Sequence, residues 1–107
     1  MESLRKGISD TVNELNKLLR LTSDPEQETR LRQLRRIYYL LWEEVIEKEI
    51  DKNTADYKAA LESLALAHET IETAKRDIAT IADAIEKAVA AAKAVNKIVD
   101  FGFDMLV

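Results

Sequence analysis

His68 is the only histidine of the chain, so it is the first place to look for acid–base or metal chemistry. Di-iron sites in helical bundles use Glu-x-x-His elements on facing helices, but Ala65 stands where such an element needs its glutamate. We therefore interpret His68 as a half-buried packing residue that contacts water or Glu69. A pH-sensing or acid–base role is the alternative.

Carboxylates are the next candidates for chemistry, because four of them gather in a short stretch: Glu43, Glu44, Glu47 and Glu49. They could hold a cation only loosely, and a solvated acidic helix end is the better interpretation. The chain has no cysteine nucleophile, no glycine-rich phosphate loop and no serine with a recognisable base. We therefore predict a protein that is not an enzyme and that has no cofactor, catalytic residue or metal site.

A basic cluster is the one feature that suggests nucleic acid: Arg30, Arg32, Arg35 and Arg36, followed by Tyr38, Tyr39 and Trp42. Arginines beside aromatic rings can bind phosphate and stack on bases. However, glutamates flank the cluster at spacings that favour i to i+4 pairing along a solvated helix. We prefer that surface role. Tyr39 and Trp42 lie on a flank with Ile46, where they either pack on the third helix or anchor a partner, and we favour packing.

These residues must be positioned by helices. The chain has 107 residues, is 47% hydrophobic and 34% charged, and contains two glycines and one proline, a profile typical of a helical bundle. We expect one all-α domain over residues 1–107. A net charge of -4 argues against indiscriminate nucleic-acid binding. The absence of cysteine, of a signal-like start and of a long apolar run predicts a cytoplasmic protein.

Apolar spacing and capping residues divide the chain into three expected helices. The first covers about 3–21, with Ser3 as its cap. The second covers about 25–51, with Asp24 at the N-cap and Pro25 at the first helical position. The third covers about 54–101, with Asn53 or Thr54 as its cap, because a seven-residue apolar repeat runs through it without glycine or proline. An apolar tail, 102–107, follows.

The repeat of the expected third helix alternates large and small residues, which lets a partner helix approach closely. Its first position holds Tyr57, Leu64, Ile71, Ile78, Ile85, Ala92 and Val99, and its fourth holds Ala60, Ala67, Ala74, Ile81, Ala88 and Val95. A continuous helix over 54–101 would span roughly 70 Å, against roughly 39 Å for the second and 27 Å for the first. The two shorter helices would leave its distal half bare.

A bare apolar half of a helix indicates an interface. We expect residues 78–107 to meet a second copy in antiparallel register, which gives a homo-oligomer, most simply a dimer. The expected interface residues are Ile78, Ile81, Ile85, Val89, Val95, Val99, Phe101 and Phe103. The alternative is that the first helix covers the distal half within the same chain.

The pattern as a whole predicts a helical protein–protein interaction module that buries apolar side chains by helix packing. An adaptor, a chaperone-like protein and a toxin-neutralising protein all fit this class. One alternative is a peripheral membrane protein that uses the amphipathic C-terminal helix, although acidic residues there nearly cancel the lysines. A second alternative is weak nucleic-acid binding through the cluster Arg30–Arg36.

Overall fold

The computed structural model describes residues 3–100, which form four α-helices and one short 3₁₀ turn. The helices are α1 (Leu4–Leu21), α2 (Pro25–Glu47), α3 (Ala55–Arg76) and α4 (Ile81–Val99), and the 3₁₀ turn η1 (Ile78–Thr80) lies between the last two. The prediction of an all-α helical bundle is therefore confirmed.

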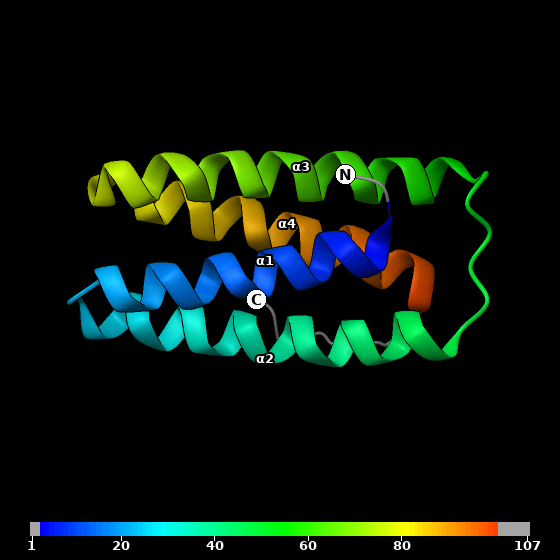
Figure 1. Ribbon diagram of the computed structural model, residues 1–107, viewed down its shortest axis with the longest axis horizontal. Helices are drawn as coiled ribbons and strands as arrows, with labels where there is room; N and C mark the ends of the chain where they lie inside the picture. The colour runs from blue at the N-terminus through cyan, green and yellow to red at the C-terminus, as the bar shows by residue number, and fades with distance from the viewer. Residues whose placement is uncertain (1–2, 101–107) are drawn as a thin grey trace.

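Two helical hairpins lie side by side in this bundle (Figure 1). Helices α1 and α2 form one hairpin and α3 and α4 form the other. Between the hairpins, α1 packs along α3 and α2 packs along α4, each pair running in the same direction (Figure 1). The connection 48–54 crosses one end of the bundle to join the two hairpins.

Capping residues begin three of the helices as the sequence predicted. The Ser3 hydroxyl accepts a hydrogen bond from the Lys6 N–H, and the Asp24 carboxylate accepts one from the Glu26 N–H, just before Pro25. Thr54 does the same for α3. These side chains satisfy amide groups that have no partner inside the helix. The second helix is shorter than predicted and ends at Glu47 instead of residue 51.

The predicted continuous helix over 54–101 is wrong, because α3 ends at Arg76 and α4 begins at Ile81. Asp77 interrupts it in an extended conformation, and its carboxylate accepts a hydrogen bond from the Ala79 N–H at 3.2 Å. The longest dimension of the molecule is 39 Å, well short of the roughly 70 Å that an unbroken helix would span. Folding back at Asp77 removes the apolar face of residues 81–99 from water, which supplies the driving force for the turn.

One apolar core joins all four helices. Its largest fully buried side chains are Leu4, Ile8, Leu15, Leu18, Leu31, Tyr38, Leu41, Leu64, Ile71, Ile85, Val95 and Val99. Fully buried alanines line α3 and α4, which pack closely on each other: Ala60, Ala67, Ala74, Ala84, Ala88, Ala91 and Ala92. The small residues of the repeat therefore serve the packing of this helix pair within one chain.

Candidate interaction surface

Four of the six predicted interface residues that the structure describes lie inside the bundle. Ile85 is 1% exposed, and three others are buried with it: Ile81, Val95 and Val99. Val89 is partly buried against the core, whereas Ile78 in η1 is 41% exposed. Phe101 and Phe103 lie outside the described residues. Over residues 81–99 the distal half on which the predicted interface depended is not bare, because α4 folds back on α3 and α2 and is covered by its own chain.

The exposed large apolar side chains among residues 3–100 are concentrated on one helix. Tyr39, Trp42 and Ile46 of α2 are 50%, 38% and 38% exposed, and we call these three residues the α2 stripe. Their spacing of three and four residues places them on one face of the helix. The remaining exposed large apolar residues, Leu21, Leu66 and Ile78, lie on three other elements. The sequence favoured packing on another helix, but the exposure of these three side chains favours the role of an anchor.

Two hydrogen bonds to α1 hold the helix that carries the stripe. Before the stripe, the Arg35 Nη1 donates to Asn16 Oδ1 at 2.8 Å. At its other end, the Arg5 Nη2 donates to the Ile46 carbonyl at 3.4 Å. The core side of α2 is fixed as well, because the Tyr38 hydroxyl donates to the Ala88 carbonyl of α4 at 2.6 Å. The stripe therefore lies on a helix that is hydrogen-bonded both to α1 and to α4.

Charges of opposite sign lie at the two ends of the stripe. Arg32 and Arg36 precede it, and Glu43 and Glu47 accompany its second half. Arg32 pairs with Glu28 at 3.7 Å, but neither Arg36 nor Glu43 has an ion-pair partner within residues 3–100. A surface with this polarity favours a partner whose charges run in the opposite order.

A second polar cluster, joining α1 to α3, was not predicted from the sequence. The Lys75 Nζ donates to Glu14 Oε2 at 2.6 Å and to Glu72 Oε1 at 2.8 Å. Burial raises the pKa of the Glu14 carboxyl, but side-chain hydrogen bonds, above all the one from Lys75, outweigh burial and lower this pKa to about 2. The same hydrogen bonds raise the pKa of Lys75. The residues are far apart in the sequence, so no local spacing could reveal the pair.

His68 lies at the edge of this cluster. Its Nε2 is 3.9 Å from Glu72 Oε1, and its Nδ1 is buried without a hydrogen-bond partner among the described residues. The carboxylate near His68 is therefore Glu72, one turn further along α3, and the predicted contact with Glu69 is not found within residues 3–100. Within residues 3–100 no group of three or more His, Cys, Asp or Glu side chains is arranged to hold a metal ion.

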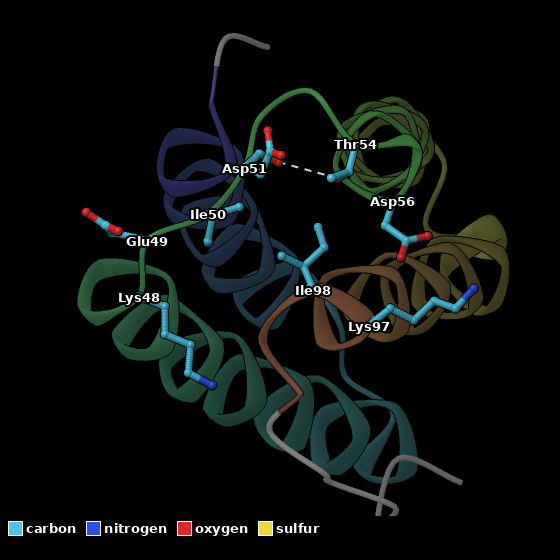
Figure 2. A pocket seen from close by; sticks show the side chains of 8 residues that line it. All are labelled: Lys48, Glu49, Ile50, Asp51, Thr54, Asp56, Lys97 and Ile98. Carbon is cyan, nitrogen blue, oxygen red and sulfur yellow. Dashed lines mark hydrogen bonds between the residues drawn. The ribbon is translucent and has the colours of Figure 1, made fainter.

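A shallow hollow of about 240 Å³ lies under the connection 48–54, next to the end of α4 (Figure 2). Its lining mixes charges of both signs with Ile50 and Ile98. The charged ends of Lys48, Glu49 and Lys97 point away from it in Figure 2, so they do not converge on a common point. A ligand site needs a few convergent polar groups, which this hollow does not offer. A similar hollow of about 330 Å³ adjoins the start of α1.

Comparisons of the chain with protein-family models, with curated proteins and with solved structures find no match. None of the described helices has the combination of length and apolar character that crossing a membrane requires.

Proposed function

We propose that this chain is a cytoplasmic, non-enzymatic helical interaction module that binds another protein through the α2 stripe. The observation that carries the proposal is the line of three large, solvent-exposed apolar side chains, Tyr39, Trp42 and Ile46, on one helix face. Tyrosine and tryptophan are enriched among the residues that dominate binding energy at protein interfaces. An adaptor, a chaperone-like protein and a toxin-neutralising protein would all use such a face.

The partner that fits this face best is an amphipathic helix. A helix laid along α2 would place apolar residues at spacings of three and four against the stripe. The free charges of Arg36 and Glu43 favour a partner with an acidic group near the first and a basic group near the second. The hydrogen bonds from Arg5 and Arg35 to neighbouring helices reduce the ordering that binding would require.

The experiment compares proteins captured from cells by three forms of the chain. The test variant carries Tyr39→Ser and Ile46→Ser, and the matched control carries Leu21→Ser and Leu66→Ser, which removes the same number of exposed apolar side chains elsewhere. The proposal expects a partner that the wild type and the control retain and the test variant loses. The purified partner should then bind the wild type at least tenfold more tightly than the test variant, the effect of losing about 1.4 kcal/mol. Equal retention by all three forms would contradict the proposal.

Binding to RNA and binding to lipid vesicles, the two alternatives, are tested with the same purified chain. Salt-sensitive binding of a single-stranded RNA probe that is lost in Arg32→Glu/Arg36→Glu would assign the basic end of α2 to nucleic acid instead. Binding to vesicles of anionic lipid would favour the amphipathic-helix alternative. That outcome would require α4 to leave the core, because Ile81, Ile85 and Val95 are buried there.

A further inference from the structure

The turn between α3 and α4 is centred on Asp77. Asp77 has φ -140° and ψ 92°, whereas α3 before it, the 3₁₀ turn η1 and α4 after it are all helical. Neither glycine nor proline occurs anywhere from residue 54 to residue 100. A change of the Asp77 backbone from extended to helical, with a smaller change at Thr80 from φ -93° and ψ 10°, would therefore allow residues 55–99 to form one continuous helix.

The buried positions keep the same seven-residue phase on both sides of this turn. Ile71 and Ala74 are buried before it, and Ile81, Ile85 and Ala88 are buried after it, at the positions that the same repeat requires. In two separate helices joined by a turn, the buried residues are not required to follow one common seven-residue repeat. Ile78 occupies the one position of the repeat between them, and it is 41% exposed. In a continuous helix Ile78 would complete a single apolar stripe.

The hydrogen bonds that hold the turn are all local. The Ala79 N–H donates to the Asp77 carboxylate, and both the Thr80 N–H and its hydroxyl donate to the Asp77 carbonyl. Opening the turn would break these bonds and would also remove α4 from its own bundle. A second copy can restore every core contact by supplying its own α4, including the Tyr38 hydroxyl bond to the Ala88 carbonyl. Exchange of an identical element is a low-cost route to a dimer.

We propose that two copies of this chain exchange their α4 helices by straightening at Asp77. Each chain then contributes one long helix over 55–99, and the two long helices run antiparallel with Ile78 of each copy near the two-fold axis. Every α4 packs on α3 and α2 of the other copy. The exchanged dimer leaves the α2 stripe of each copy exposed, so it would present two such surfaces to a partner, a consequence that rests on the proposed function.

A distance within one chain distinguishes exchange from ordinary surface association. Lys58 and Lys97 are exposed, Lys58 near the start of α3 and Lys97 near the end of α4. These two helix ends lie at the same end of the bundle (Figure 1), and the chain has no cysteine, so Lys58→Cys/Lys97→Cys accepts two spin labels cleanly. The labelled protein is diluted into a tenfold excess of unlabelled protein, refolded at high concentration and separated into monomer and dimer. Pulsed electron resonance then measures the distance between labels in each fraction.

The proposal expects a short distance in the monomer and its loss in the dimer, where the labels should be roughly 60 Å apart along one helix. A dimer that keeps the short distance would overturn the proposal, because its two copies would associate without exchange. A protein that stays monomeric at every concentration after refolding would also overturn it. The stripe variant Tyr39→Ser/Ile46→Ser should exchange like the wild type, so failure of the stripe as a binding surface would leave this result unchanged.

Substitutions in the turn provide the second test. Asp77→Ala/Thr80→Ala removes the two side-chain hydrogen bonds of the turn and keeps the one from the Thr80 N–H to the Asp77 carbonyl. The variant favours a continuous helix, so it should lower the dimer dissociation constant about tenfold. The matched control is Thr73→Ala, which removes a similar hydroxyl bond, from Thr73 to the Glu69 carbonyl, outside the turn. The control should leave the dissociation constant unchanged. Equal dissociation constants for both variants would contradict a hinge at Asp77.

Discussion

Lys75 of α3 donates a hydrogen bond from its Nζ to Glu14 Oε2 of α1 at 2.6 Å, and this ion pair joins the two hairpins. The Glu14 side chain is only 10% exposed, so water screens the pair weakly. Glu72 shares the same ammonium group from within α3. Lys75 therefore links a contact within one helix to a contact between helices.

Loss of the Glu14 charge should weaken the bundle more than loss of the Glu72 charge. Glu14→Gln leaves Lys75 with one carboxylate and removes the link to α1, which should lower the free energy of unfolding by about 2 kcal/mol. Glu72→Gln is the control, because Glu72 is more exposed and its pairing lies within one helix, worth about 0.5 kcal/mol. Urea denaturation followed by circular dichroism measures both values. Equal losses would contradict this prediction, because the ion pair between α3 and α1 would then stabilise the bundle no more than the ion pair within α3.

Stability should fall in acid as Glu14 takes up a proton. Its pKa is about 2 in the folded protein and 4.5 without these interactions, so the folded state favours the charged form. The stabilisation, about 2 kcal/mol, is therefore complete above pH 4.5 and is lost as pH falls from 4.5 toward 2. Unfolding curves at several pH values should show this loss in the wild type and a shallower one in Glu14→Gln. Parallel pH profiles for the two proteins would contradict the lowered pKa.

Substitution of Tyr38 tests the other contact between the two hairpins, the one between α2 and α4. Its hydroxyl is fully buried and donates to the Ala88 carbonyl, and burial raises its pKa far above the ordinary value. Tyr38→Phe removes the hydroxyl and keeps the ring, so it should lower the free energy of unfolding by about 1 kcal/mol. Tyr39→Phe is the control, because Tyr39 is half exposed, and it should change stability by less than about 0.5 kcal/mol.

The buried alanines predict a sharp difference between two adjacent positions in α4. Ala91 is fully buried and Ala90 is exposed. Ala91→Leu inserts three carbons into a filled core and should cost about 2 kcal/mol, whereas Ala90→Leu should be close to neutral. Thermal unfolding of the two variants, which have identical compositions, measures the difference directly. Similar melting temperatures would mean that α4 does not pack as described.

The sequence predicted the helical class and the beginnings of three helices, because caps and apolar spacing are local signals. Ser3, Asp24 and Thr54 each bond to an amide within a few residues. It did not predict the break at Asp77, because an unbroken apolar repeat with no glycine or proline is compatible with one long helix. What decides the turn is the burial of residues 81–99 on α3 and α2, a non-local gain that periodicity cannot reveal.

The candidate site was predicted only in part for the same reason. Tyr39, Trp42 and Ile46 were placed together on a flank of one helix, but whether another helix covered that flank depended on how the hairpins lie. The residues expected at an interface, such as Ile85 and Val95, proved to be core because their covering helices come from the same chain. The predicted homo-oligomer stays a prediction, now with exchange of α4 as its proposed route.

The most direct test of the binding role is site-specific photocrosslinking in cells. A photoreactive phenylalanine analogue replaces Tyr39 in one variant and Leu66, exposed on α3, in the other. Binding through the α2 stripe predicts a discrete crosslinked protein from position 39 that disappears when Ile46→Ser is added, and no such product from position 66. The same products from both positions, or none from position 39, would contradict the assignment of the α2 stripe as the binding surface.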